Sequence, residues 1–342
     1  MDDGNRPGAA AADPGTPAPA DPPAAAAPPL VTETSAAPAP GTGTSAAQDA
    51  APVPDGAAAQ GVPASPETGS GPAKSGRNLP VAAGVGVLLG GIVVLTLFTV
   101  KATFLIFMGA AAVVALWELA RVLGSRGIHA PFLPVAAGGT AMWVCEYWWS
   151  DRAVLASLVL TVVVILAWRL PGGTDGYLRD VMAGVFVLAY VPLLAVFMVA
   201  MLAPADGSRR VLIFVVLTIC SDIGGYFAGS LLGRHPMARA ISPSKTWEGL
   251  AGSVLVCLVA GAVLLPVLLH AHVWQGILTG AGAVAAAVLG DLAESAIKRD
   301  LQVKDMGSVL PGHGGVLDRI DSLLVTAPVI WLLMAVFVSV HH

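Results

Sequence analysis

Long runs of apolar residues, each close to the length of a membrane span, occupy most of the chain from residue 80 onwards. A helix needs about 20 apolar residues to cross the hydrocarbon core of a bilayer. The ranges that meet or approach this length are 80–99, 102–121, 131–149, 153–169, 181–203, 211–232, 247–269, 275–296 and 322–340. The pattern predicts an all-α fold, a polytopic integral membrane bundle of about nine transmembrane helices.

Residues 1–77 differ in composition from the rest of the chain. Ala, Pro, Gly, Ser and Thr dominate this segment, and it contains no aromatic residue. Such a segment buries too little apolar surface to offset the entropy lost on ordering, and it lacks the charged start and apolar core of a signal peptide. We therefore predict a disordered, Ala/Pro-rich tail over residues 1–77 and a membrane-embedded domain over residues 78–342. A tether or partner-docking role for the tail stays open.

Composition supports a membrane protein and narrows its function. Hydrophobic residues make up 56% of the chain and charged residues 12%, against about 25% charged residues in an average soluble domain. No basic patch of the kind that binds nucleic acid is visible. The cysteines, Cys145, Cys220 and Cys257, lie in apolar runs without metal-ligand spacing, so we expect them to be small packing residues.

Basic residues are distributed unevenly between the loops on the two sides of the predicted bundle. Loops after odd-numbered spans hold four Lys or Arg residues. Loops after even-numbered spans hold eleven: Arg121, Arg126, Arg169, Arg179, Arg234, Arg239, Lys245, Lys298, Arg299, Lys304 and Arg319. Loops rich in Lys and Arg stay in the cytoplasm. The N-terminus and the polar loops 233–246 and 297–321 are therefore predicted to be cytosolic.

The most polar stretch of the membrane domain lies between the last two apolar runs. It contains the cations Lys298, Arg299, Lys304 and Arg319 and the carboxylates Asp300, Asp305, Asp318 and Asp321. Ionisable groups close to membrane segments are energetically costly and usually functional. Cations beside carboxylates suit a bound polyphosphate together with its metal ion.

Several polar side chains at the end of the preceding apolar run share one face of the predicted helix. Asp291, Ser295 and Lys298 stand at positions i, i+4 and i+7, with Glu294 at i+3. These residues therefore share a stripe on one helix. The stripe is suited to holding a metal ion, a ligand hydroxyl and a phosphate in succession. The alternative is a helix end whose Lys298 and Arg299 extend to the membrane interface, which leaves Asp291 unexplained.

Two further carboxylates open the last apolar run. Asp318 and Asp321 stand at i and i+3, on one face of the predicted helix. With Asp291 they would provide three oxygen ligands from two helices, a set suited to Mg²⁺ that bridges substrate phosphates. The alternative is that one of them caps the helix, because negative charge is favoured at a helix N-terminus.

A glycine-rich loop separates the two groups of carboxylates. Gly312, Gly314 and Gly315 would let backbone amides approach an anion and form a nest for phosphate oxygens. His313 lies among them and would bond a phosphate oxygen or pack as a turn residue. Many glycine-rich loops only turn the chain, so the charged residues on both sides carry the functional interpretation.

A second polar segment lies upstream. Asp222 stands inside an apolar run, where an isolated charge must pair, bind an ion or line a wet cavity. Ser242 and the residues after it resemble a helix start with Glu248 in the first turn. Lys245 in this segment is well placed to bind a phosphate. The alternative is that the segment only caps a helix.

Other charges near the apolar runs have ordinary explanations. We expect Glu118 to pair with Arg121 at i+3, as at many helix ends. Glu146 stands among tryptophans and a tyrosine, which is typical of the aromatic belt at a membrane interface.

The polar stretch as a whole resembles the signature of the phosphatidate cytidylyltransferases, also called CDP-diacylglycerol synthases. The matching positions are Ser295, Lys298, Arg299, Lys304, Asp305, Gly307, Leu310, Pro311, Gly312, His313, Gly314, Gly315, Asp318, Arg319 and Asp321. Asp222 with Gly225 and the segment 242–249 resemble upstream parts of the family. Ser244 departs from the family pattern, and the tail of residues 1–77 is not part of it.

The resemblance implies an enzyme of the cytoplasmic membrane that condenses CTP with phosphatidic acid to CDP-diacylglycerol and pyrophosphate. Residues 78–342 would be the catalytic domain, with Mg²⁺ as cofactor and a second cation or a homodimer left open. Asp291 and Asp318 are implied as metal ligands, with Asp321 as a third ligand or partner. The residues implied as catalytic are Ser295, Lys298, Arg299, Lys304, Asp305, His313, Arg319, Lys245 and Asp222. Among them the four cations of the polar stretch would neutralise phosphates, Ser295 and His313 would hydrogen-bond phosphate oxygens, and Lys245 and Asp222 would complete the side of the lipid phosphate.

Two other functions remain as alternatives. A CTP-dependent lipid-alcohol kinase would share the nucleotide and the metal but move the γ-phosphate. A transporter of anionic lipids would also combine many spans with buried charge, but transporters tend to show matching interrupted helices in two repeated halves. The polar residues here crowd into the C-terminal half, which disfavours a transporter.

Overall fold

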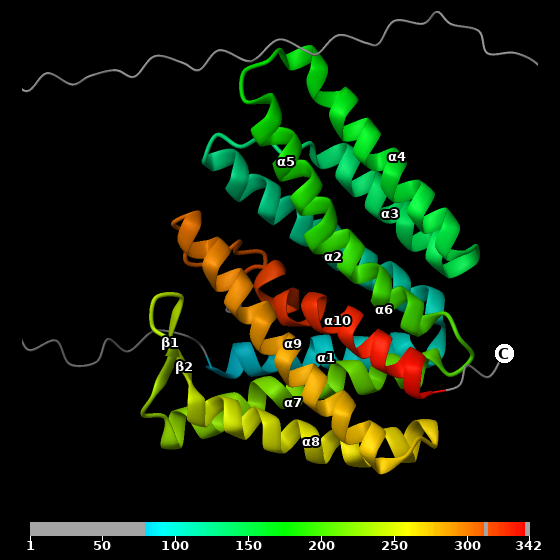
Figure 1. The fold of residues 1–342 in the computed structure, drawn as a ribbon, viewed down its shortest axis with the longest axis vertical. Helices are drawn as coiled ribbons and strands as arrows, with labels where there is room; N and C mark the ends of the chain where they lie inside the picture. The colour runs from blue at the N-terminus through cyan, green and yellow to red at the C-terminus, as the bar shows by residue number, and fades with distance from the viewer. Residues whose placement is uncertain (1–78, 311–313, 339–342) are drawn as a thin grey trace, which may run out of the picture. The chain divides into compact units, whose positions relative to one another are not determined.

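The computed structural model describes residues 79–310 and 314–338 of the chain (Figure 1). The predicted tail and the predicted site residues Gly312 and His313 lie outside the described residues. Within the described part, helices predominate and two short strands pair with each other.

Helices follow the predicted apolar runs in order along the chain. They are α1 (Leu79–Thr99), α2 (Lys101–Ser125), α3 (Phe132–Trp148), α4 (Asp151–Arg169), α5 (Tyr177–Leu188), α6 (Leu194–Leu202), α7 (Gly207–Leu232), α8 (Trp247–Leu269), α9 (Val273–Asp300) and α10 (Leu317–Phe337). The 3₁₀ helix η1 (Leu170–Gly172) follows α4, and the π-helical turn η2 (Ala189–Leu193) joins α5 to α6.

Seven of the described helical segments are long and apolar enough to cross a membrane. They are α2, α4 with η1, α5 through α6, α7, α8, α9 and α10. Helix α3 has 17 residues and falls short of this measure. The all-α membrane bundle is therefore confirmed, and the count of nine spans stays a prediction.

The segment before α8 is a hairpin rather than the first turn of a helix. Strand β1 (Pro236–Ala238) pairs antiparallel with β2 (Ser242–Thr246). Helix α8 begins at Trp247, and Thr246 caps it by accepting a hydrogen bond from the N–H of Gly249 at 3.1 Å. The predicted helix start at Ser242 was wrong, because strand pairing keeps the chain extended until the threonine cap, but Glu248 lies in the first turn of the helix as predicted.

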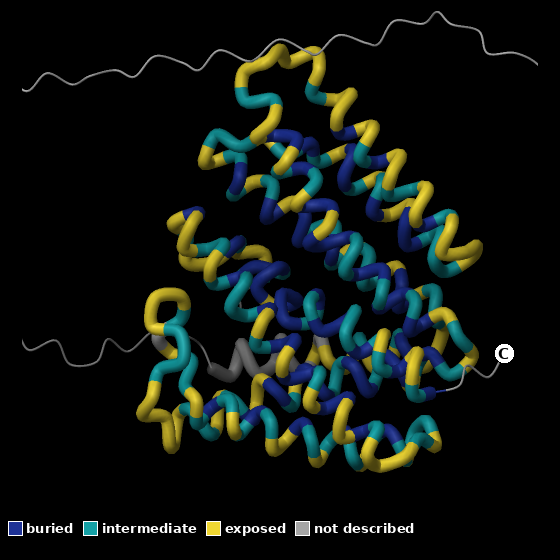
Figure 2. The backbone as a smooth tube through the Cα atoms, in the orientation of Figure 1, coloured by how far each residue is buried: buried dark blue, intermediate teal, exposed yellow. Residues whose placement is uncertain are grey.

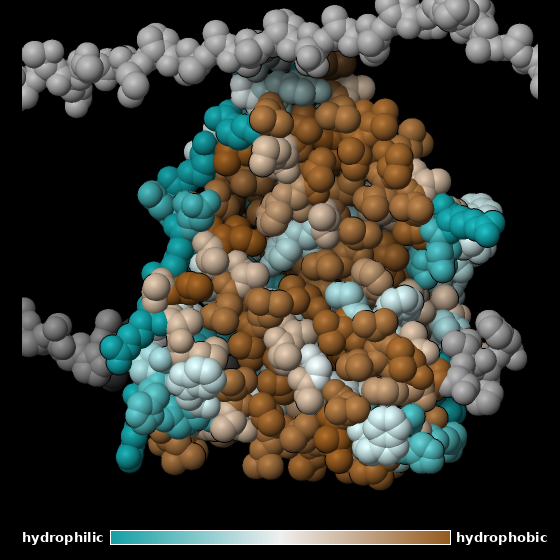
Figure 3. All heavy atoms as spheres, viewed as in Figure 1, coloured by the Kyte–Doolittle hydropathy of each residue, from teal (hydrophilic) through white to brown (hydrophobic). Residues whose placement is uncertain are grey.

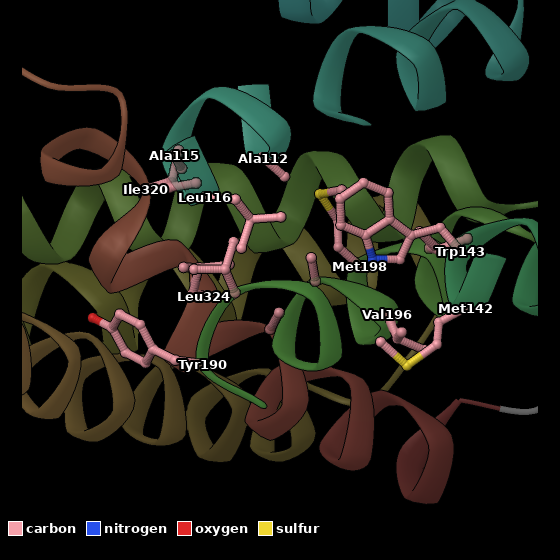
Figure 4. Close-up of a cluster of buried hydrophobic side chains, with 14 of the residues drawn as sticks. Ala112, Ala115, Leu116, Met142, Trp143, Tyr190, Val196, Met198, Ile320 and Leu324 are labelled. Atoms are coloured by element: carbon pink, nitrogen blue, oxygen red, sulfur yellow. The ribbon is translucent and has the colours of Figure 1, made fainter. Parts of the chain in front are cut away.

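Apolar side chains of α2, α3, α6 and α10 form the central core. Leu116, Trp143, Met198 and Leu324 belong to it (Figure 4). The exposed positions gather on the outer faces of the helices and in the connecting loops (Figure 2). Much of the outer surface is apolar, with polar groups at two opposite edges (Figure 3). An apolar surface of this size is typical of a protein that contacts lipid.

The helices on one side of the bundle approach closely through glycine. Where α7 crosses α8, a Cβ on Gly224 would lie 2.8 Å from the carbonyl oxygen of Gly252. Gly261 and Gly276 meet in the same way between α8 and α9. Small residues allow helix backbones to come together inside a membrane, where no hydrophobic force drives them together. Helices α7, α8 and α9 thus form a tight group (Figure 1).

Candidate active site

A cavity of about 500 Å³ lies between α7, β2, α8, α9 and α10. The predicted site residues that line it are Asp222, Lys245, Asp291, Ser295, Lys298, Asp318, Arg319 and Asp321. Its lining includes residues of the second half of α9 and of the first turns of α10, and α9 ends and α10 begins on the same side of the bundle (Figure 1). The fold therefore brings together residues that the sequence distributes over about 100 positions.

Helix α10 separates its polar from its apolar side chains. Asp318, Asp321 and Ser322 line the cavity. Ile320 and Leu324 point into the core cluster on another face (Figure 4). This division follows from the helical period, because residues three and four apart share a face. The same rule accounts for the stripe on α9, which the cavity confirms.

Asp318 makes more hydrogen bonds than the other cavity carboxylates. Lys298 Nζ lies 2.7 Å from Asp318 Oδ1 and 2.7 Å from Glu294 Oε2. The N–H of Met306 donates to Asp318 at 3.1 Å, and the N–H of Gly315 donates at 2.8 Å. The Asp318 side chain is only 2% exposed, so it depends on these charge-assisted bonds. Asp318 thereby links α9, α10 and the loop between them.

Lys245 and Asp291 form an ion pair across the cavity. The ammonium group on β2 contacts Asp291 Oδ2 on α9, and the two side chains are 35% and 21% exposed. Ion pairs with this much exposure contribute little stability. A phosphate group can therefore replace Asp291 as the partner of Lys245, and a cation can replace Lys245 as the partner of Asp291.

Two other carboxyl groups of the cavity are more buried than that of Asp291. Glu294 and Asp321 both line the cavity and are only 4% and 6% exposed. No donor among the described residues reaches Glu294 Oε1. Two neighbouring carboxylates repel each other unless a proton or a cation lies close by.

The charges around the cavity fit a divalent cation. Its lining residues include five carboxylates and three Lys or Arg side chains. Within residues 79–310 and 314–338, no three His, Cys, Asp or Glu side chains form a ready-made metal site. Mg²⁺, however, usually takes only one or two protein carboxylates and completes its shell with water and substrate phosphates. Asp291 and Asp321 provide oxygens of this kind, so the donor set fits Mg²⁺.

The remaining described site residues lie outside the cavity lining, at the end of α9 and in the loop that follows. They are Arg299, Lys304, Asp305, Gly314 and Gly315. Arg299 donates through Nε to the carbonyl oxygen of Ile241 in the hairpin turn. Gly314 has φ +86°, a conformation that favours glycine, and its N–H donates to the carbonyl oxygen of Leu310. The amides of Gly314 and Gly315 thus donate within the protein, and their binding of phosphate stays a prediction.

Comparison with known proteins identifies the family. Residues 81–337 match the model of the cytidylyltransferase family. The chain belongs to this family. Phosphatidate cytidylyltransferase of Mycobacterium leprae is 40% identical over 281 residues, which cover 76% of this chain and 89% of the relative.

Other relatives of this cytidylyltransferase have the same name. The phosphatidate cytidylyltransferase of Mycobacterium bovis is 38% identical over 278 residues, which cover 77% of this chain and 90% of the relative. That of Staphylococcus epidermidis is 32% identical over 187 residues, which cover 54% of this chain and 71% of the relative. The family resemblance drawn from the polar stretch is confirmed.

Two glutamates of this cytidylyltransferase have surroundings that the sequence did not indicate. Glu294 was placed on the α9 stripe but not among the site residues, although it lines the cavity. Glu118 does not pair with Arg121 as expected. It is 1% exposed and accepts a hydrogen bond from the N–H of Leu317 at 2.9 Å, whereas Arg121 lies over the ring of Trp117. The only sequence signal for Glu118 was its place inside an apolar run.

Proposed function

We propose that the protein transfers the cytidylyl group of CTP to phosphatidic acid, which yields CDP-diacylglycerol and pyrophosphate for phospholipid biosynthesis. The observation that carries this conclusion is the cavity at the end of the bundle, where Lys245, Lys298 and Arg319 stand beside an excess of carboxylates. Such a cavity suits a polyphosphate with its cation, and the membrane helices around it suit a lipid substrate. Relatives up to 40% identical are named for the same activity.

The proposed reaction is a single displacement at phosphorus. An oxygen of the phosphatidate phosphate bonds to the α-phosphorus of CTP, and the bond from that phosphorus to the bridging oxygen of the β-phosphate breaks. Pyrophosphate leaves with the bonding electrons, and no covalent enzyme intermediate forms. Reactions of this type depend mainly on positioning and on neutralisation of charge.

The cations of the cavity would neutralise the phosphates. Lys298 is held by Glu294 and Asp318, so its ammonium group keeps one orientation before a substrate arrives. Arg319 and the hydroxyl group of Ser295 line the same cavity and would donate to phosphate oxygens. Prearranged donors of this kind need little reorganisation during the reaction.

Asp291 and Asp321 are the residues that we propose to hold Mg²⁺. When bound, Mg²⁺ reduces the repulsion between the triphosphate and the incoming lipid phosphate. Asp318 has N–H donors on both oxygens, so in this proposal it anchors Lys298 and the loop, and its role as a metal ligand stays a prediction. We place Lys245 and Asp222 on the side of the lipid phosphate.

We further propose that the protein lies in the cell membrane with this cavity open to the cytosol, where CTP is found. The support is the excess of Lys and Arg in the loops at the end of the bundle that holds the cavity, eleven against four. A second cation and a homodimer remain expectations that come from the family resemblance.

Labelled CTP distinguishes this reaction from its alternatives. The purified protein is incubated with Mg²⁺, phosphatidic acid and CTP labelled at the α- or the γ-phosphate. Label from the α-position in the lipid, with release of pyrophosphate, is expected. Label from the γ-position would instead identify a kinase, and lipid movement between leaflets without consumption of CTP would identify a transporter.

A matched pair of arginine variants tests whether the cavity carries the activity. Arg319→Met removes a cation from the cavity, and Arg152→Met removes an exposed arginine from α4. We expect the first variant to lose about 100-fold in turnover, the scale of a lost donor to a developing charge. The second should match the unaltered protein, and equal activity of both would exclude Arg319 from the site.

A further inference from the structure

The described part of the loop between α9 and α10, residues 301–310 and 314–316, carries part of the predicted site but does not line the cavity. Its amides at Met306 and Gly315 donate to Asp318. The geometry of the loop therefore determines where Asp318 lies, and with it Lys298. A displaced loop would disturb the cavity without removing any residue from it.

Helix α2 contacts this loop from outside the cavity. Figure 4 shows Ala115 of α2 next to Ile320 of α10, and the two helices are in contact. Near one end of the loop, Arg126 Nη2 donates to the carbonyl oxygen of Gln302 at 3.1 Å. At the other end, the Glu118 carboxylate accepts the hydrogen bond from the N–H of Leu317. Glu118 of α2 and Arg126, which follows the last residue of that helix, thus hold the two ends of the loop.

Glu118 also lies between the outgoing and the returning part of the loop. A Cβ on Gly307 would overlap Glu118 Oε1, and a Cβ on Gly315 would lie 2.8 Å from Glu118 Oε2. Both glycines are therefore places where the loop backbone approaches the carboxylate. This contact gives a packing reason for two glycines of the polar stretch, independent of any phosphate nest.

A carboxylate is an unfavourable choice for a purely structural contact at this place. Glu118 is almost fully buried, and no donor among the described residues reaches its Oε1. A buried acceptor without a partner costs stability, which an apolar side chain of similar volume would avoid. Among the described residues, the N–H of Leu317 needs the acceptor that Glu118 provides. Leu317 belongs to the first turn of α10, where backbone donors lack partners within the helix.

We propose that Glu118 is a positioning residue for the transfer reaction: it fixes the start of α10 and the loop against α2, so that Asp318, Arg319 and Asp321 keep their orientation in the cavity. This role rests on the proposed function. It requires a hydrogen-bond acceptor at the right distance, and it does not require a negative charge.

Two substitutions at position 118 distinguish the effect of the acceptor's position from the effect of its charge. Glu118→Gln keeps an acceptor at the same distance and removes the charge, whereas Glu118→Asp keeps the charge and withdraws the acceptor by one methylene. We expect Glu118→Asp to lose about 100-fold in kcat, as expected for a site displaced by about 1 Å. Glu118→Gln should stay within about threefold of the unaltered protein, since less than 1 kcal/mol is then lost. Glu146→Asp on α3 is the matched control.

Hydrogen exchange of the loop amides provides a readout that needs no substrate. Exchange over residues 303–317 should be faster in Glu118→Asp and unchanged in Glu118→Gln and Glu146→Asp. Normal exchange with normal kcat in Glu118→Asp would overturn the proposal, as would a loss in Glu118→Gln equal to that in Glu118→Asp. If the unaltered protein does not form CDP-diacylglycerol, the proposed function fails, while the exchange experiment still tests the contact.

A double-mutant cycle keeps the proposal testable if Glu118→Asp folds poorly. Gly307→Ala places a methyl group against Glu118, so it should disturb the loop in the unaltered protein. With the shorter aspartate at position 118, the methyl group has more space and the same change should cost less. Independent effects of the two substitutions would contradict contact between these residues.

Discussion

Asp291 and Asp318 line the same cavity, but their partners differ. Asp291 contacts Lys245 and remains accessible, while Asp318 is buried and accepts hydrogen bonds from Lys298 and two backbone amides. An accessible carboxylate with one weak partner is available to a ligand. A buried carboxylate with several donors holds structure together, because each donor would lose its partner if the carboxylate were removed.

Asparagine substitutions should separate these two roles. Asp291→Asn is expected to abolish turnover while the melting temperature stays nearly the same, because only a partly exposed ion pair is lost. Asp318→Asn should lower both turnover and melting temperature, since breaking a buried ion pair costs about 3 kcal/mol or more. Thermal unfolding in detergent and the CTP assay measure both quantities. An unchanged melting temperature for Asp318→Asn would refute its anchoring role.

Residue-level prediction from the sequence succeeded for the polar stripe on α9 and failed for Glu118. The helical period alone placed Asp291, Ser295 and Lys298 on one face, and all three line the cavity. The helical period could not identify the partner of Glu118, because that partner, Leu317, lies 199 positions further along the chain. The same limit applies to Asp318, whose amide donors come from a loop without a sequence period.

At the scale of elements, the crossing of α7 and α8 holds one wall of the cavity. Gly224 is buried at this crossing, and Asp222, which lines the cavity, lies two residues before it on the same helix. The three heavy atoms nearest to a Cβ at Gly224 are backbone atoms of Gly252 and Ser253, which cannot move aside as the end of a flexible side chain can. A methyl group there must therefore push the two helices apart.

Gly224→Ala should lower stability and activity together. Overpacking costs about 1–3 kcal/mol, while alanine gains about 1 kcal/mol of helix propensity over glycine, so the net effect at this crossing is destabilising. Gly90→Ala on α1 is the control, because no heavy atom lies within 4 Å of a Cβ there. It should be neutral or stabilising. Equal melting temperatures for the two variants would argue against a tight crossing.

Prediction of elements was reliable for apolar runs and poor for the hairpin. The length and composition of a membrane helix are visible in any window of about 20 residues. The strands β1 and β2 have three and five residues, and their pairing depends on contacts across a turn. The apolar run beginning at residue 247 marked the start of α8, but the segment from Ser242 to Thr246, which resembled a helix start, is a strand.

At the scale of the whole molecule, the polar residues of the site gather at one end of the bundle. The β1–β2 hairpin and the start of α10 lie there, while α4 begins at the opposite end of the bundle (Figure 1). Residues of β2 and of the first turns of α10 line the cavity. A water-soluble substrate and a substrate held in the bilayer meet most easily at such an end of a membrane bundle. The direction in which this end faces therefore determines whether CTP can enter.

Single cysteines test the orientation. In a variant whose native cysteines, Cys145, Cys220 and Cys257, are replaced by alanine, Arg234→Cys marks the cavity end and Asp151→Cys the start of α4; both positions are exposed. Because Lys- and Arg-rich loops remain cytosolic, a membrane-impermeant maleimide added to intact cells should label position 151 and not position 234. After permeabilisation, both should be labelled. Labelling of position 234 in intact cells would place the cavity outside, away from CTP, and would refute the proposed orientation even if the purified protein is active.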